Sequence, residues 1–354
     1  MTERFDAART LLRRAVADRA TPAAAIEVGG AAGPAWQEAF GSLTYDPGAA
    51  PAALDTIFDL ASLTKVVCTT TLAMRAVEGG RLGLEDPVAH WIPEWRGADR
   101  EMVTVRDLLA HTSGLTGYLP LFNDPHVRGR REFQRAICAL PLEYPPRTGS
   151  IYSDLGFILL GFILEDAAGV PLAGQFPAIA GLVAPEPLAF DPPPDWRPRI
   201  APTEVDPWRG RLLAGEVHDE NCWALDRAAG HAGLFGTTAA VGRFARLVLQ
   251  TATRDTALAH RATLMTFLHP TEVPGSSRAL GWDTMRPTSS CGRLMPPDAI
   301  GHTGFTGTSL WIVPSADRYV VLLANRVHPS RDNEAFRTVR PGVHDAVVEA
   351  WGHG

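Results

Sequence analysis

Lysine is almost absent from this sequence. Its 354 residues include 33 lysines and arginines, and Lys65 is the only lysine among them. An arginine keeps its proton near neutral pH, whereas a buried lysine can release one. A position that keeps lysine while every other basic position is arginine suggests chemistry that needs an amine. Lys65 is therefore the first candidate for a functional residue.

An excess of positive charge and a long apolar run are also missing. The formal net charge is −6, which disfavours nucleic acid as a partner because such binding needs a basic surface. The longest apolar run covers only residues 155–164, whereas a helix needs about 20 residues to span a bilayer. We therefore expect no membrane span. Residues 1–6 contain acids and no apolar stretch, unlike a secretory signal, so the cytoplasm is the expected location.

Motifs for metals, redox chemistry and nucleotides are missing as well. The four cysteines lie far apart without a C-x-x-C pair, which argues against zinc and redox sites and favours buried free thiols. The sequence has no H-E-x-x-H, G-x-x-x-x-G-K-[S/T] or G-x-S-x-G motif. His218 and Asp219 are neighbours, but no known metal-ligand spacing surrounds them. We expect neither a metal nor a cofactor.

The apolar pattern predicts strands near both ends of the chain and helices between them. We expect an α/β fold, with an antiparallel β-sheet flanked by helices plus an inserted all-helical lobe. A single domain over 1–354 would have its α/β lobe at about 1–70 and 270–354 and its helical lobe at about 71–269. The proline-rich stretch 184–210 predicts a long ordered loop or a flap. The predicted strands are 24–28, 35–40, 56–60, 279–283, 299–303, 308–313 and 319–324, and the predicted helices are 5–18, 62–78, 104–111, 153–168, 237–250 and 333–350.

Ser62 and Lys65 are three residues apart at the start of a predicted helix. Residues at this spacing share a helix face, so the amine can reach the hydroxyl. The start of a helix also favours developing negative charge on Ser62. Apolar neighbours predict a desolvated Lys65 with a lowered pKa, and a neutral amine can take the serine proton. The alternative is a capping serine beside an exposed lysine.

Two further motifs carry groups suited to acyl transfer. Tyr152 comes just before a predicted helix, where its phenol can relay a proton if a neighbouring cation lowers its pKa; the alternative is that residues 152–154 only cap that helix. His302-Thr303-Gly304-Phe305 ends a predicted strand. Small residues there leave room for a substrate backbone along the strand, and the amide of Phe305 can pair with that of Ser62 as an oxyanion hole. The alternative is a simple glycine turn.

In this order, the three motifs resemble those of the serine β-lactamase and penicillin-binding protein superfamily. Segments 58–65, 103–115, 202–204, 215–221 and 230–235 are similar to its class C β-lactamase, DD-peptidase and esterase branch. The resemblance covers about residues 5–350. It implies an acyl-enzyme on Ser62, with Lys65 as the base and Tyr152 as the proton relay. It also implies that Asp154, His302, Thr303, Gly304 and Phe305 bind the substrate.

Two positions depart from the usual pattern of that superfamily. Asp154 replaces an asparagine, and its charge can keep Lys65 protonated and shift the role of base to Tyr152. His302 replaces a lysine, and a neutral imidazole is a poorer partner for a carboxylate at pH 7. This second change weakens the β-lactamase interpretation. Arg286 is the alternative cation, against its interpretation as a solvated surface arginine.

We therefore expect a serine hydrolase that acts through an acyl-enzyme on small-molecule esters, D-amino-acid amides or D-Ala-D-Ala-type peptides. A β-lactamase is the alternative within this class. From another class, the departures at Asp154 and His302 suggest a catalytically silent ligand-binding protein on the same fold. A Ser-His-Asp hydrolase that uses His302 is a third interpretation. His231 is a candidate for the pocket wall or for a turn, and the sequence indicates no oligomeric state.

Overall fold

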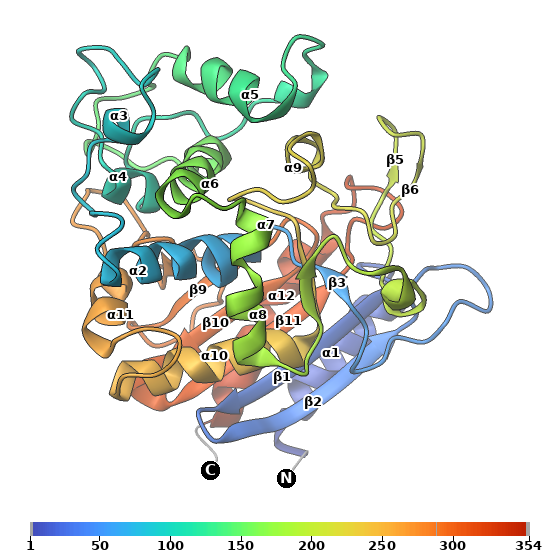
Figure 1. Ribbon diagram of the computed structural model, residues 1–354. Helices are drawn as coiled ribbons and strands as arrows, with labels where there is room; N and C mark the ends of the chain where they lie inside the picture. Colours follow the sequence, from blue (N-terminus) through green and yellow to red (C-terminus); the bar gives the residue numbers. More distant parts are fainter. Residues whose placement is uncertain (1–2, 288, 352–354) are drawn as a thin grey trace.

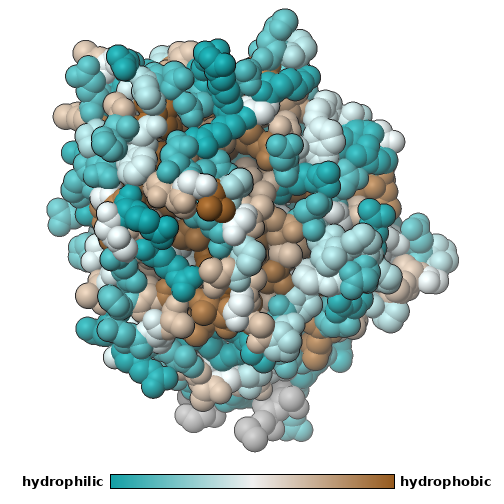
Figure 2. Space-filling view, viewed as in Figure 1, coloured by the Kyte–Doolittle hydropathy of each residue, from teal (hydrophilic) through white to brown (hydrophobic). Residues whose placement is uncertain are grey.

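A computed structural model describes residues 3–287 and 289–351 of the chain (Figure 1). The domain expected over 1–354 also includes residues 1–2, 288 and 352–354, which lie outside the described residues. Hydrophilic side chains dominate the margins of the face shown in Figure 2, and apolar side chains appear mainly near its middle.

The two ends of the chain meet in one antiparallel sheet, as the sequence predicts. Its six strands follow the order β2-β1-β11-β10-β9-β8. β1 from the N-terminal part pairs with β11 from the C-terminal part, with Ile26 opposite Leu322. This pairing confirms the predicted α/β architecture. The strands are β1 (Ala23–Gly30), β2 (Gly33–Gly41), β8 (Asp283–Thr284), β9 (Ile300–Thr303), β10 (Ser309–Val313) and β11 (Arg318–Ala324).

Helices cover both faces of this sheet (Figure 1). On one face, α1 (Asp6–Ala17) and α12 (Ala335–Trp351) pack around a cluster that includes Leu12, Trp311 and Val347. On the other face, α10 (Thr238–Thr253) packs against β1 and β11. Alternate residues of β11 therefore join different cores, Val320 and Leu322 one and Val321 and Leu323 the other. Although α10 falls within the range 71–269 expected for the helical lobe, it packs on the sheet because its buried side chains face the strands.

The remaining helices form a layer above the sheet, with α6 (Asp154–Ala168) at its centre (Figure 1). Residues 155–164 of α6 are all buried, which explains the apolar run in the sequence. In the described part of the chain no single helix is long and apolar enough to cross a membrane; α6 and residues 172–183 pass by length and composition only as a pair bent by 62°. The other helices are α2 (Thr71–Glu78), α3 (Val88–Trp91), α4 (Val105–Leu109), α5 (Gly129–Cys138), α7 (Leu172–Gln175), α8 (Pro177–Val183), α9 (Glu220–Ala224) and α11 (Arg261–Leu268).

Short elements connect the two layers. The strands β3 (Phe58–Asp59), β7 (Leu234–Gly236) and β4 (Leu188–Phe190) form a small sheet, and β5 (Val205–Asp206) pairs with β6 (Arg211–Leu212). The proline-rich stretch 184–210 contains β4, β5 and a 3-10 helix over Pro194–Arg199, joined by ordered loop. The other 3-10 helices are Glu3–Phe5, Leu121–Asn123 and Pro314–Ala316.

Two predicted elements differ from the structure. The helix predicted over 62–78 begins only after Ser62, which lies in a turn, and it opens with a π-helical segment, η2 (Lys65–Thr70), before α2. The strand predicted over 279–283 is reduced to β8, because Gly281 has φ +83° and passes close to Thr70. A Cβ at Gly281 would lie 1.9 Å from the Thr70 hydroxyl oxygen, so the close approach of these two segments requires glycine.

Gly242 of α10 provides a test of how tightly this helix packs on the sheet. A Cβ there would lie 1.8 Å from Oε1 of the buried Glu27, which accepts hydrogen bonds from Arg246 and Tyr319. Gly242→Ala should lower the free energy of unfolding by about 1–3 kcal/mol through overpacking, although alanine favours helix. The matched control is Gly181→Ala in α8, where a Cβ meets open space and a gain of about 0.5–1 kcal/mol is expected. Chemical denaturation measures both, and equal effects would contradict the packing described.

Candidate active site

Ser62 lies in a turn that neighbouring segments hold firmly. The preceding residue, Ala61, has φ +48°, a left-handed conformation that costs a non-glycine residue energy. Asp59 stabilises the turn, because its carboxylate accepts a hydrogen bond from the Ala61 amide at 2.8 Å. The hydroxyls of Thr306 and Thr308 donate to the carbonyls of Asp59 and Leu60. The β9–β10 connection therefore fixes the position of Ser62.

Lys65 is the centre of the site. Its side chain is fully buried, and its Nζ lies 2.9 Å from Ser62 Oγ, 2.7 Å from Asp154 Oδ1 and 3.1 Å from the carbonyl oxygen of His231. The amine thus reaches the hydroxyl, as the spacing predicts. Asp154 stands at the start of α6, and His231 belongs to the turn before β7. Three separate segments therefore converge on one amine.

The direction of the Lys65 pKa differs from the prediction. Burial lowers this pKa, as expected for a desolvated ammonium, but the Asp154 carboxylate and Tyr152 oppose that effect and the net shift is upward. The sequence-based expectation of a lowered pKa is therefore wrong. The short ion pair and the raised pKa of Lys65 agree with the expectation that Asp154 keeps Lys65 protonated.

Tyr152 lies against the same amine. Lys65 Nζ is 4.8 Å from the centre of the Tyr152 ring, which packs between the rings of His111 at 4.8 Å and His302 at 5.6 Å. Its buried hydroxyl interacts with Lys65 and Ser62, although none of the described residues forms a hydrogen bond of good geometry with it. Burial raises the Tyr152 pKa more than the Lys65 charge lowers it. Tyr152 is therefore a neutral phenol at rest, against the expectation of a lowered pKa.

The residues predicted at the end of β9 line the same site. His302 is buried and its Nδ1 lies 2.9 Å from the Thr303 carbonyl oxygen, while no described residue bonds to its Nε2. Burial and the charges of Lys65 and Arg278 hold the His302 pKa well below its usual value, so the imidazole is neutral. Gly304 is required because a Cβ would lie 2.1 Å from the Thr308 hydroxyl oxygen. Phe305 follows, with 43% of its surface exposed.

Two hollows open on either side of Ser62, and Ser62, Asp154 and Phe305 line both. We call them the arginine hollow and the carboxylate hollow. The arginine hollow, about 350 Å³, is also lined by Tyr152, Arg278, Asp283, His302, Thr303, Gly304, Arg337 and Arg340. The carboxylate hollow, about 400 Å³, is also lined by Ala61, Tyr118, His218, Asp219, Glu220, Ala232 and Arg331.

The sequence analysis missed the basic residues of the arginine hollow. Arg340 of α12 is buried, its guanidinium donates to the Thr308 carbonyl at 3.0 Å, and its Nε has no partner in the described part of the chain. Burial and two nearby arginines lower its pKa to about 10. Arg278 lies 5.0 Å above the Tyr152 ring. Arg286 instead donates to the carbonyl of Ser276 and is not among the lining residues. Only the tertiary fold brings Arg278 and Arg340 to Ser62.

Buried pairs support the carboxylate hollow. His231 Nε2 lies 2.8 Å from Asp219 Oδ1, and His218 Nε2 lies 2.9 Å from Glu204 Oε2. Burial raises the Asp219 pKa, but the neighbouring His231 outweighs this effect and lowers it. His218 and Asp219 line the hollow directly, whereas His231 holds Lys65 through its carbonyl. His231 therefore helps to position Asp219 and Lys65, and His218 is held in the lining of the hollow by Glu204.

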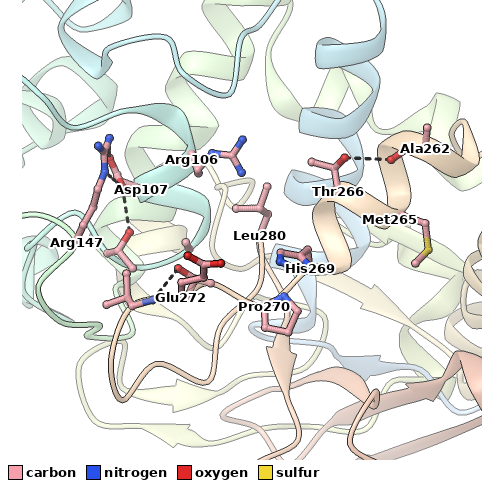
Figure 3. Close-up of a pocket in the computed structure, with 14 residues that line it drawn as sticks. Arg106, Asp107, Arg147, Ala262, Met265, Thr266, His269, Pro270, Glu272 and Leu280 are labelled. Atoms are coloured by element: carbon pink, nitrogen blue, oxygen red, sulfur yellow. Dashed lines mark hydrogen bonds and ion pairs between the residues drawn. The ribbon is translucent and has the colours of Figure 1, made fainter.

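A larger cavity, of about 640 Å³, lies elsewhere, between α4 and α11 (Figure 3). Asp107 and Arg147 form an ion pair at 2.8 Å on one side of it, and Met265 and His269 lie on the other. None of the residues predicted from the three motifs lines this cavity. The chemistry predicted for the chain is concentrated at Ser62 instead.

Comparisons with known proteins identify the family of this chain. A family model described as Beta-lactamase matches residues 8–343. Two relatives named "Putative D-alanyl-D-alanine carboxypeptidase" cover most of the chain: one from Salmonella gallinarum is 30% identical over 78% of this chain and 71% of its own, and one from Escherichia coli K12 is 29% identical over 77% and 70%.

Solved structures show the same fold. Unliganded simvastatin synthase (LovD) from Aspergillus terreus is similar over 100% of both chains, with 21% identity and a TM-score of 0.77. A penicillin-binding protein homologue from Caulobacter crescentus is similar over 97% of both chains, with 20% identity and a TM-score of 0.73. EstCE1, a hydrolase with promiscuous acyltransferase activity, has 21% identity and a TM-score of 0.74 over 97% of this chain and 99% of its own. The chain belongs to the Beta-lactamase family of serine hydrolases and penicillin-binding proteins.

Proposed function

We propose that this protein hydrolyses esters, D-amino-acid amides or D-Ala-D-Ala-type peptides through an acyl-enzyme on Ser62. The observation that carries the proposal is the contact of the buried Lys65 amine with both Ser62 Oγ and Asp154 Oδ1. Nucleophilic catalysis needs an alcohol beside a group that manages its proton. The names of the two carboxypeptidase relatives and of EstCE1 support this choice of substrates.

The surrounding residues have matching roles in the proposed reaction. Ser62 attacks the substrate carbonyl, and the amides of Ser62 and Phe305 would stabilise the oxyanion that forms. Tyr152, a neutral phenol beside Lys65, can pass a proton to the leaving group. The exposed ring of Phe305 lines both hollows and would contact a substrate in either of them.

The arginine hollow favours substrates that carry a carboxylate. Arg278 and Arg340 line it, while the neutral His302 contributes no charge. An arginine binds a carboxylate through charge-assisted hydrogen bonds. The C-terminal carboxylate of a D-Ala-D-Ala-type peptide would lie here when its scissile carbonyl is at Ser62. Arg278 and Arg340 thus take the place that the sequence analysis considered for Arg286.

The nucleophile is tested by covalent labelling. After exposure to a fluorophosphonate or to penicillin, intact-mass analysis and peptide mapping should find one adduct, on Ser62. Ser62→Ala should lose both the adduct and turnover, because no other group can form the acyl-enzyme. Ser315→Ala, in the distant turn between β10 and β11, serves as the control and should keep both. Full activity in Ser62→Ala would refute the proposed function, whereas a wild-type protein that binds ligand but shows neither adduct nor turnover would favour the silent binding protein.

The carboxylate partner is tested by comparing two substrates. Arg278→Gln should raise KM for a D-Ala-D-Ala peptide about 10- to 100-fold, the effect of losing one charge-assisted hydrogen bond. Turnover of an uncharged p-nitrophenyl ester should change less than about threefold, since it makes no such bond. Arg286→Gln is the matched control and should leave both substrates unaffected. An equal loss of activity toward the ester and the peptide would show that Arg278 does not bind the substrate carboxylate.

A further inference from the structure

We propose that Asp154 is the final acceptor of the serine proton, with Lys65 passing it on. The inference rests on the proposed acyl-enzyme and adds a catalytic acid–base residue to it. The sequence assigned Asp154 to substrate binding, but its Oδ1 lies 2.7 Å from Lys65 Nζ. That distance is typical of a charge-assisted hydrogen bond along which a proton can move.

The hydrogen bonds of Lys65 show why a second acceptor is needed. An ammonium group has three N–H donors and no lone pair, and Lys65 has three partners: Ser62 Oγ, Asp154 Oδ1 and the His231 carbonyl. Because a protonated Lys65 has no lone pair, it cannot accept a further proton. Lys65 must therefore release one proton as it takes the proton of Ser62. Of its three partners, only the Asp154 carboxylate is a base that can hold it.

The other titratable groups around Lys65 do not offer the same route. Tyr152 also acts on Lys65 as a hydrogen-bond partner, but burial raises its pKa, so it is a neutral phenol that keeps its own proton and is a far weaker base than a carboxylate. His111 uses its Nδ1 to accept a hydrogen bond from the Ser153 amide at 3.0 Å. His302 has no contact with Lys65 in the described hydrogen bonds, and its Nδ1 is directed at Thr303. Asp154 is the base in direct contact with the amine.

The step balances as a relay of two protons. As Ser62 Oγ forms a bond to the substrate carbonyl carbon, its proton moves to Lys65 Nζ, and a different proton of Lys65 moves to Asp154 Oδ1. When the bond to the leaving group breaks, Lys65 protonates the leaving atom, either directly or through Tyr152, which gives its phenol proton to the leaving atom and takes one from Lys65. Asp154 then returns its proton to Lys65. The Lys65–Asp154 pair keeps the same total number of protons at the start and the end of acylation.

The environment of Asp154 suits a carboxylate that takes up a proton briefly. Its side chain is 19% exposed, so it is partly desolvated without being sealed from the hollows. Several charged or titratable side chains line the same two hollows as Asp154. In the carboxylate hollow these are His218, Asp219, Glu220 and Arg331, and in the arginine hollow they are Tyr152, Arg278, Asp283, His302, Arg337 and Arg340. Charged groups of both signs therefore face the Lys65–Asp154 pair.

The test is the pH dependence of acylation in wild type and Asp154→Asn, followed as the burst of p-nitrophenol from p-nitrophenyl acetate. In wild type the relay needs no proton to be lost to solvent, so the burst rate should be level from pH 6 to 9. In Asp154→Asn, Lys65 must first lose its proton to solvent. Its burst rate should fall at least about 100-fold at pH 6 and recover as the pH rises.

Two controls make the result specific. Asp166 lies on the same helix, near its C-terminal end, and its side chain is exposed. Asp166→Asn should therefore leave the pH profile of the burst rate unchanged. In mixtures of H2O and D2O, the burst rate should depend on deuterium content along a curve in wild type, because two protons move, and along a straight line in Asp154→Asn. Circular dichroism and melting temperature confirm that each variant is folded.

The outcomes separate this inference from the proposed function. If wild type shows no burst and no adduct on Ser62, the acyl-enzyme itself fails. If wild type shows a burst whose rate rises only in alkaline solution, a neutral lysine or a tyrosinate is the base and the relay is wrong. The relay is equally refuted if Asp154→Asn shifts the profile toward acid, since loss of the Asp154 charge lowers the pKa of both those groups.

Discussion

The buried ion pair of Lys65 and Asp154 is the constraint on which the site depends. A buried charge costs several kcal/mol unless it is paired and hydrogen-bonded, and Lys65 has no exposed surface. Its stability therefore requires that the Ser62 turn, the start of α6 and the turn before β7 meet at one point. Gly230 permits this meeting, because a Cβ there would lie 2.0 Å from the Phe157 carbonyl oxygen in α6. The packing of these three segments thus brings the ion pair together, and the need to pair the buried Lys65 charge favours that packing.

The sheet and the helical layer contribute different parts of the site. β9 and its following turn supply His302 and Phe305 and hold Ser62 through Thr306 and Thr308, whereas α6 supplies the counter-ion of Lys65. The two hollows differ in their lining because α12 brings Arg337 and Arg340 to one, whereas Glu220 of α9 lines the other and pairs with Arg331 there. A substrate with its reacting carbonyl at Ser62 would therefore meet different side chains at its two ends.

Patterns within short segments predicted much of this arrangement. Apolar periodicity indicated α6 and the strands at both chain ends, and the spacing of Ser62 and Lys65 indicated their contact. The direction of the Lys65 pKa was not accessible in the same way, because its partner Asp154 is 89 residues away. Arg278 and Arg340 were missed for a similar reason: isolated arginines are common in this sequence, and only the fold brings these two to Ser62.

The charge of Lys65 tests the account most directly, and the composition of the chain makes it measurable. Because Lys65 is the only lysine, labelling lysine with ¹⁵N at Nζ gives a single side-chain resonance. The account predicts the chemical shift of an ammonium, unchanged from pH 6 to 9, with coupling to three protons. A resonance with the shift of a neutral amine anywhere in that range would contradict the ion pair and the mechanism built on it.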